Sequence, residues 1–131
     1  MKIFTSYFAN QSKLVNAGII PIGIALYTPK WYKGLEYKKI APKAFMLSGN
    51  LTQEEYIKYY NAYVLAKINH AEVIADLQRL TGGKDCALLC YEKPGDFCHR
   101  HLFSEFMRRK GYDIKEWEPK EEPKPQQMSL F

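Results

Sequence analysis

Four short stretches of the chain have the residue pattern of β-strands. Residues 2–8 (KIFTSYF) are rich in β-branched and aromatic side chains, while residues 18–26 (GIIPIGIAL) and 85–92 (DCALLCYE) are apolar at consecutive positions. A strand that is apolar on both faces is typical of a parallel sheet covered by helices on both sides. Pro21 counts against the first half of residues 18–26, because proline lacks the N–H that a sheet ladder needs. Residues 112–117 (YDIKEW) are the candidate last strand.

Two segments between the second and third of these stretches have the 3.6-residue periodicity of amphipathic helices. Thr52 and Glu55 have the spacing of a capping box, and Asn69 with Glu72 repeats it before the second segment. The glycines of TGG at residues 81–83 end that second segment. The apolar positions expected to face the core are Ile57, Tyr60, Val64, Val73, Ile74, Leu77 and Leu80.

A third amphipathic helix is expected after residues 85–92. Pro94, Gly95 and Asp96 suit a turn, and Asp96 is the expected N-cap. The basic residues and the glycine of RRKG at 108–111 are typical of a helix C-terminus. Its apolar stripe comprises Leu102, Phe103, Phe106 and Met107.

Strands that alternate with helices predict an α/β fold. We expect one compact three-layer domain with a mainly parallel sheet over residues 1–117, a size that suits a single core. Residues 118–131 are expected to be a disordered tail, because their first eight residues hold three prolines and five charged side chains.

The charge distribution adds a weak functional indication. The chain carries a formal net charge of +5, of which the tail contributes two lysines against three glutamates, or −1, so that the body carries +6. A basic body suits a polyanionic partner such as DNA or a nucleotide. An apolar content of 47% excludes disorder of the whole chain.

The three cysteines are expected to be free thiols. Cys86, Cys90 and Cys98 lie too close together for a distributed disulfide framework, and the first residues do not have the pattern of a signal peptide. The longest apolar run, residues 18–26, is too short to span a bilayer. We therefore expect a cytoplasmic protein without a membrane partner.

The segment from 27 to 43 is expected to be a long loop. It combines prolines and a glycine with lysines interleaved between aromatic rings, a composition that suits single-stranded nucleic acid, with rings for the bases and lysines for the phosphates. The alternative is a loop whose rings pack under the body. The candidate nucleic-acid-binding residues are Lys30, Trp31, Tyr32, Lys33, Lys38 and Lys39.

Residues 90–101 (CYEKPGDFCHRH) concentrate the groups with chemical potential. They are expected at the point where a strand ends and a helix begins, which is where α/β sheets bind ligands. Unpaired N–H groups of the first helical turn favour an anion, lower the pKa of a thiol there, and would act together with Arg100 on a phosphate. We therefore expect Cys98, His99 and Arg100 to bind an anion, and Cys98, Glu92 and His99 to be catalytic.

Each of these side chains also has a structural interpretation. Cys90 and His99 can be core residues, and Glu92 can be a base, a ligand for a hydroxyl or the partner of Arg100. Because adjacent helical residues do not share a face, His101 is expected to be a better neighbour for the Cys98 thiol than His99. A zinc site from Cys90, Cys98 and a histidine is an alternative, but it lacks paired Cys-x-x-Cys spacing, so no metal site is predicted.

The segment ALLCYEKPGDFCHR (87–100) resembles the signature of the domain-of-unknown-function 488 family. That pattern is an apolar strand, Leu-Cys-x-Glu, a short turn and Cys-His-Arg at a helix start. Here it maps onto Leu89, Cys90, Glu92, Cys98, His99 and Arg100.

The likeness extends over roughly residues 2–118. The loop IALYTPKWYKGLEYKKIAPK (24–43) is similar to that of one branch of the family, whereas TSYFAN (5–10) stands where other branches have Gly-His-Ser. The resemblance implies a three-layer α/β domain with a pocket beside the Cys-His-Arg helix, and it implies no particular reaction.

The tail ends in a short segment that contains three apolar residues. Gln127, Met128, Ser129, Leu130 and Phe131 resemble the pentapeptide that binds the bacterial DNA sliding clamp. Leu130 and Phe131 would fill an apolar cleft, and Gln127 would supply directional hydrogen bonds. A tether of this kind raises the effective concentration of the body near DNA.

Three functional hypotheses follow. The preferred one is a nucleic-acid-associated protein tethered to the sliding clamp, with an anion- or nucleotide-binding pocket and a role in DNA repair or replication-linked processing. The second is a non-enzymatic adaptor or modulator of the clamp. The third is a small-molecule enzyme with a thiolate nucleophile.

Overall fold

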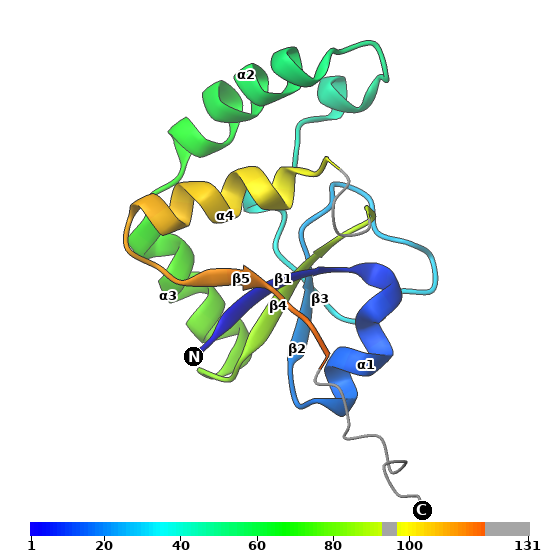
Figure 1. Cartoon of the computed structure of the whole chain (residues 1–131), viewed down its shortest axis with the longest axis vertical. Coiled ribbons are helices and arrows are strands. Elements are labelled where there is room, and N and C mark those ends of the chain that lie inside the picture. Colours follow the sequence, from blue (N-terminus) through cyan, green and yellow to red (C-terminus); the bar gives the residue numbers. More distant parts are fainter. Residues whose placement is uncertain (93–96, 120–131) are drawn as a thin grey trace, which may run out of the picture.

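A five-stranded, all-parallel sheet forms the centre of the molecule (Figure 1). The computed structural model describes residues 1–92 and 97–119. Along the sheet the strands follow the order β3-β2-β4-β1-β5. Their bounds are β1 (Ile3–Tyr7), β2 (Ile20–Gly23), β3 (Leu35–Glu36), β4 (Cys86–Cys90) and β5 (Ile114–Glu116).

Helices cover both faces of this sheet. The described helices are α1 (Gln11–Asn16), α2 (Gln53–Tyr63), α3 (His70–Thr81) and α4 (His99–Arg109), with short 3-10 turns at Phe8–Asn10, Lys38–Ile40, Ala44–Leu47 and Leu65–Lys67. One core cluster joins Leu14 of α1 to Ala87 and Leu89 of β4. The other joins α3 and α4 to Cys86 and Leu88 of the same strand. The predicted three-layer α/β fold with a parallel sheet is therefore confirmed.

The middle strand explains why residues 85–92 are so uniformly apolar. β4 lies between β1 and β2, and all five of its residues are buried. Successive side chains of a strand point to opposite faces, so both faces need apolar side chains when helices cover both. Pro21 is accommodated inside β2, paired in register with Ala87.

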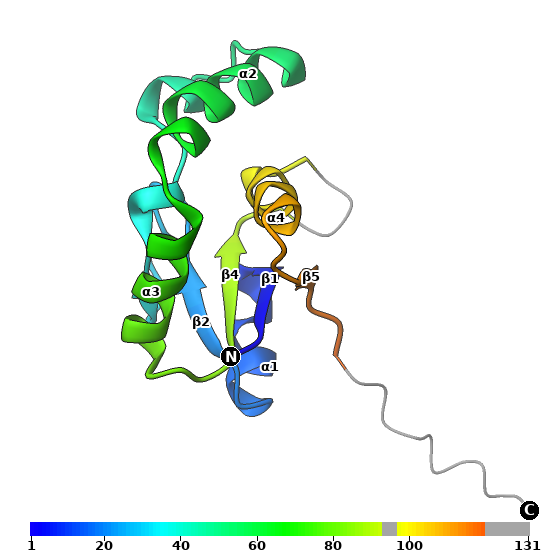
Figure 2. The same ribbon diagram turned by 90° about the vertical axis from the view of Figure 1, so that its left-hand side faces the viewer.

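α2 lies beyond the carboxyl ends of β2 and β4, on the side toward which both strands point (Figure 2). The predicted capping box is confirmed at its start, where the Thr52 side chain accepts from the Glu55 N–H and Glu55 accepts from the Thr52 N–H. Tyr60 anchors the helix to the body, because it is fully buried and donates a hydrogen bond from its hydroxyl to the Ile40 carbonyl at 2.6 Å. This contact holds α2 above the end of the sheet.

Local detail departs from the sequence prediction in four places. The expected loop at residues 27–43 contains β3 and a 3-10 turn, and α1 was not predicted because it is only six residues long. Asn69 caps α3 through the N–H groups of Ala71 and Glu72, although the reciprocal bond of a full capping box is not formed. Asp96, the expected N-cap of the last helix, lies outside the described residues, and the prediction is wrong because α4 begins at His99 with Cys98 as its N-cap.

Within the described residues, none of the helices combines the length and the apolar character needed to cross a membrane.

Replacing Tyr60 with Phe should destabilise the protein by about 1–2 kcal/mol, because the Ile40 carbonyl loses its partner in a buried environment. Tyr59→Phe is the matched control on the same helix, and its effect should stay within about 0.5 kcal/mol. Urea unfolding followed by circular dichroism measures both values. Equal losses from the two variants would contradict the anchoring role of Tyr60.

Candidate functional site

A cavity of about 550 Å³ opens at the carboxyl ends of β2 and β4. The chain leaves β2 toward β3 on one side and leaves β4 toward β5 on the other, so the two strands flank a topological switch point. Open α/β sheets bind ligands in the crevice at such a point. The cavity is lined by residues that follow β2, by residues that follow β4, and by α2 with the turn that precedes it.

The lining changes character with depth. Cys90, Cys98 and His99 are buried, with exposed fractions of 1%, 3% and 6%, whereas Tyr27 and Tyr91 are more than half exposed. Tyr91 donates a hydrogen bond from its hydroxyl to the Tyr27 carbonyl at 2.8 Å, which links the two strand ends at the cavity mouth. The cavity thus has an aromatic rim and a sulfur- and imidazole-lined inner end.

Cys98 lies just outside α4. It is the N-cap residue, with extended backbone angles of φ −153° and ψ 147°, and not a residue of the first turn as we expected. The rule that neighbouring helical residues diverge therefore does not apply to it, and its Sγ lies 3.7 Å from Nδ1 of His99. His99, and not His101, is the neighbour of this sulfur.

Cys90 and Cys98 are joined by a disulfide, with their Cα atoms 7.4 Å apart. This corrects the expectation of free thiols, which holds for Cys86 alone. The sequence prediction considered only how close the cysteines are along the chain. The start of α4 lies against the end of β4, and this brings two residues eight positions apart into contact.

The imidazole of His99 is held in one orientation. Its Nε2 lies 2.9 Å from the Ile24 carbonyl oxygen, and because a carbonyl can only accept, Nε2 carries the hydrogen. Burial lowers the pKa of His99 to about 4, partly offset by this hydrogen bond. The ring is therefore neutral at physiological pH, and Nδ1 presents an unprotonated lone pair to the Cys98 sulfur.

Arg100 is fully buried and is engaged by the protein itself. Its Nε and Nη2 donate to the two carboxylate oxygens of Glu116 on β5, at 3.1 and 3.2 Å. Its Nη1 donates to the Glu92 carbonyl at 2.6 Å and to the Cys90 Sγ at 3.0 Å. The guanidinium therefore ties β4, α4 and β5 together, and it is not among the groups that line the cavity.

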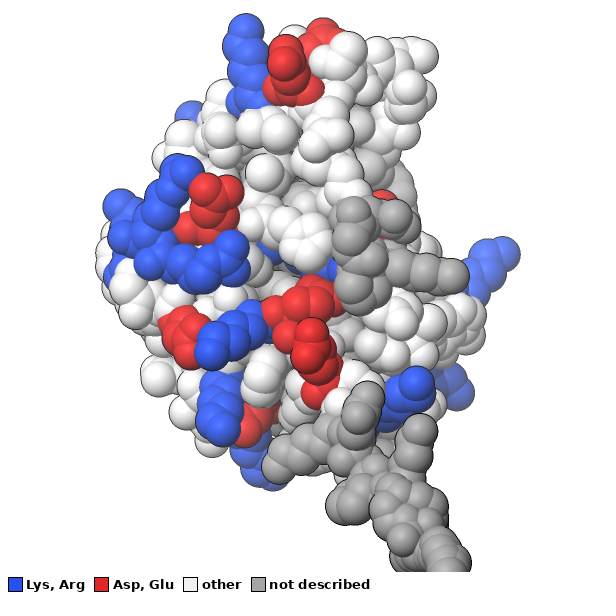
Figure 3. All heavy atoms as spheres, in the orientation of Figure 1, with Lys and Arg blue, Asp and Glu red and all other residues white. Residues whose placement is uncertain are grey.

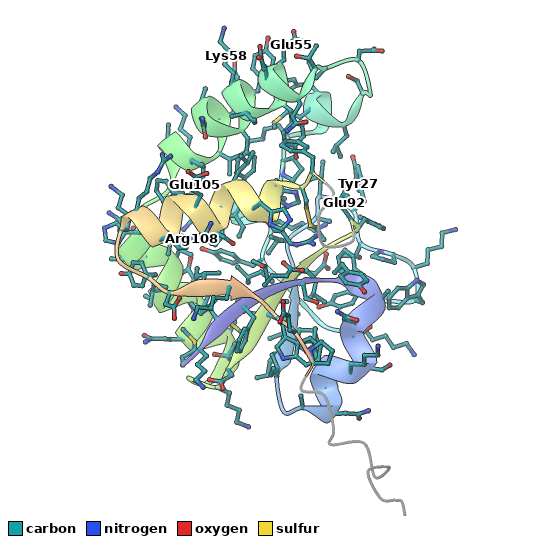
Figure 4. All side chains as sticks on the ribbon, viewed as in Figure 1. Tyr27, Glu55, Lys58, Glu92, Glu105 and Arg108 are labelled. Carbon is teal, nitrogen blue, oxygen red and sulfur yellow. A yellow bond between two sulfur atoms is a disulfide. The ribbon has the colours of Figure 1, made fainter. Side chains whose placement is uncertain are left out.

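Glu92 is among the residues that line the cavity, and its backbone carbonyl accepts a hydrogen bond from Arg100. Figure 4 shows Tyr27 and Glu92 together beside the N-terminal end of α4. Burial raises the pKa of Tyr56, and the Glu92 carboxylate raises it further. Tyr56 in turn packs edge-on against Phe97, with ring centroids 5.2 Å apart.

The aromatic and lysine residues of the 27–43 segment are not presented together. Tyr32 is buried against Phe8, with its hydroxyl donating to the Leu35 carbonyl at 2.6 Å, so it is not available for stacking on a base. Gly34 permits this arrangement, because a side chain there would collide with the Tyr32 hydroxyl.

The remaining members of that set lie on the surface. Trp31 is 57% exposed, and Lys30 and Lys33 are exposed. Lys38 pairs with Glu36 at 3.6 Å and Lys39 with Asp76 at 3.4 Å. On the face drawn in Figure 3, basic and acidic side chains are interspersed, and basic ones gather over the C-terminal end of α4, which is far from the cavity.

The candidate clamp-binding residues, Gln127, Met128, Ser129, Leu130 and Phe131, lie outside the described residues, so the clamp interaction stays a prediction.

A family profile described as the active DUF488-N3 subclade matches residues 11–111. The chain belongs to the DUF488 family. The match includes α1, the cavity-lining segments and all of α4, so the residues that line the cavity lie within the matched region, whereas Glu116 follows it. No curated protein and no solved structure matches the chain significantly.

Two partners of the site were missed in the sequence. Glu116 was assigned only to a strand, because neither the burial of Arg100 nor its pairing with Glu116 can be read from the sequence. The Ile24 carbonyl could not be found, because every residue carries that group and only the tertiary structure selects one.

Replacing Glu116 with Gln should lower the free energy of unfolding by about 3 kcal/mol, because the buried Arg100 charge loses its counter-charge. Glu105→Gln, which breaks the exposed pair with Arg109, is the matched control and should cost less than about 0.5 kcal/mol. Urea denaturation at neutral pH measures both. Indistinguishable effects would contradict the structural role assigned to Arg100.

Proposed function

We propose that this DUF488 protein binds a nucleobase, as a nucleotide or within DNA, in the cavity at the ends of β2 and β4. Once the Cys90–Cys98 disulfide is reduced, a reactive centre that contains Cys98 and His99 acts on this base. The observation that carries the proposal is the combination of an aromatic rim with a buried, oriented Cys98–His99 pair in one cavity. A volume of about 550 Å³ suits a ligand of this size.

The rim supports a flat, aromatic ligand. Tyr27, Tyr56, Tyr91 and Phe97 all line the cavity, and base–aromatic stacking tolerates any base because every base has a π-face. Glu92 adds a carboxylate that can accept hydrogen bonds from a base edge or take up a proton.

The anion-binding part of the hypothesis now depends on different groups. Arg100 is committed to Glu116, so a phosphate at this site would be bound by the N–H groups at the start of α4. Affinity would then come mainly from the base, with the phosphate directed toward solvent.

The C-terminal pentapeptide supports a second part of the proposal, in which the chain is recruited to the bacterial sliding clamp. Gln127, Leu130 and Phe131 supply the glutamine and the two apolar anchors of such motifs. Recruitment to the clamp would place the cavity at DNA during repair or replication-linked processing.

Removing the Tyr56 ring should weaken ligand binding. We expect Tyr56→Leu to raise the Kd for mononucleotides or short single-stranded oligonucleotides about tenfold, since one stacked base contributes about 1–3 kcal/mol. Tyr63→Leu, two turns further along α2 and absent from the cavity lining, is the matched control. Isothermal titration calorimetry measures both Kd values. The base-binding proposal would be refuted if the wild-type protein bound none of the mononucleotides or oligonucleotides, or if the two variants had equal effects.

Deleting Leu130 and Phe131 should abolish capture of a purified bacterial sliding clamp by the full-length chain. Gln127→Ala should weaken capture about tenfold, whereas the neighbouring Gln126→Ala should leave it unchanged, because Gln126 precedes the motif. Surface plasmon resonance measures these affinities. Clamp binding that survives the deletion would show that the pentapeptide is not the binding element.

A further inference from the structure

Three potential metal ligands converge at the inner end of the cavity. The Sγ atoms of Cys90 and Cys98 and a ring nitrogen of His99 all lie within 4.8 Å of one another. Thiolate sulfur and imidazole nitrogen are the ligands that zinc prefers in proteins. Within residues 1–92 and 97–119, no other group of three or more His, Cys, Asp or Glu side chains has its potential ligand atoms this close together.

The second nitrogen of His99 is bonded in the manner of a metal-binding histidine. Such a histidine usually donates its other N–H to a carbonyl or carboxylate, which fixes the ring and leaves the first nitrogen free for the metal. Here Nε2–H donates to the Ile24 carbonyl, and Nδ1 faces the Cys98 sulfur at 3.7 Å. The ring is thus oriented for coordination through Nδ1.

The charges around the two sulfurs favour a dication. Arg100 donates to Cys90 Sγ, but its charge is already matched by Glu116. Two buried thiolates would therefore carry an unbalanced charge of about −2, which a divalent cation neutralises.

The backbone spacing also leaves room for an ion. The Cα atoms of Cys90 and Cys98 are 7.4 Å apart, wider than the range of about 4.4–6.8 Å that is usual for disulfides. Thiolates on either side of a zinc ion stand further apart than bonded sulfurs, because each Zn–S bond is about 2.3 Å long.

We propose that, in the reduced protein, Cys90, Cys98 and His99 bind one zinc ion. All three residues line the cavity, so the fourth coordination position opens into it. Three protein ligands with one open position are typical of catalytic zinc sites, whereas structural sites are closed by four. The inference rests on the proposed function only in assigning this cavity as the reactive site. The Cys90–Cys98 disulfide is then the oxidised, metal-free form of the same two sulfurs.

The test uses tag-free, full-length protein that is reduced with a phosphine, incubated with Zn²⁺ and desalted. Mass spectrometry of the metal should find about one zinc ion per chain. Cys98→Ala and His99→Ala should each reduce zinc retention at least about tenfold. Cys86→Ala is the matched control and should retain the metal. Cys86 lies on β4, as Cys90 does, but it does not line the cavity.

A second measurement does not depend on the variants folding. Co²⁺ bound by the reduced wild-type protein should give intense sulfur-to-cobalt charge-transfer absorption and the visible bands of tetrahedral cobalt. Reduced wild-type protein that retains neither Zn²⁺ nor Co²⁺, or a cobalt spectrum without sulfur ligation, would overturn the proposal. Full retention by a folded Cys98→Ala variant would do the same.

The two proposals can fail separately. Nucleotide binding by reduced protein that does not bind zinc would refute the metal site and leave the base-binding proposal intact. Zinc retention in protein that binds none of the nucleotides or oligonucleotides would refute base binding and leave the metal site intact.

Discussion

The rest of this structure depends on the hydrogen bonds and the ion pair of the buried Arg100 guanidinium. It lies on α4 and is bonded to a carboxylate of β5, a carbonyl that follows β4 and the sulfur of Cys90. A buried charge is tolerated only when it is paired and hydrogen-bonded, so these partners must come together as the chain folds. By fixing the start of α4 against the end of β4, this arrangement also fixes Cys98 and His99.

The site that results combines two kinds of surface. Its inner end is buried and chemically specific, with a neutral imidazole held by the Ile24 carbonyl beside two sulfurs. Its rim is aromatic and exposed to solvent, and it is supplied by the segments after β2 and β4 together with α2. α2 lies over the end of the sheet because Tyr60 anchors it, so a helix that contributes little to the sheet core still shapes the cavity.

The sequence predicted correctly those features that are set by residues close together along the chain, and it missed features that are very short or that depend on distant contacts. The capping box at Thr52, the apolar strand β4 and the amphipathic face of α4 follow from side chains within a few residues, and each was predicted. The six-residue α1 and the two-residue β3 are too short for a periodic pattern, so they were missed. The composition of its segment predicted that Tyr32 contacts nucleic acid. In the structure Tyr32 is buried, and its hydroxyl forms hydrogen bonds with the backbone carbonyls of Pro21 and Leu35.

The sequence alone determined that this chain forms a parallel α/β domain with Cys90, Glu92, Cys98, His99 and Arg100 near the junction of β4 and α4, because strand pattern and helix start are local properties. Tertiary structure decided which of these groups face one another. It turned Arg100 toward Glu116, set Cys98 outside the helix beside His99, and selected the Ile24 carbonyl as the partner of the ring. Arg100 and Glu116 are 16 positions apart along the chain, and His99 and Ile24 are 75 positions apart. Cys98 and His99 are neighbours, but their contact depends on the extended backbone of Cys98. Each of these contacts forms only when the sheet and its helices have assembled.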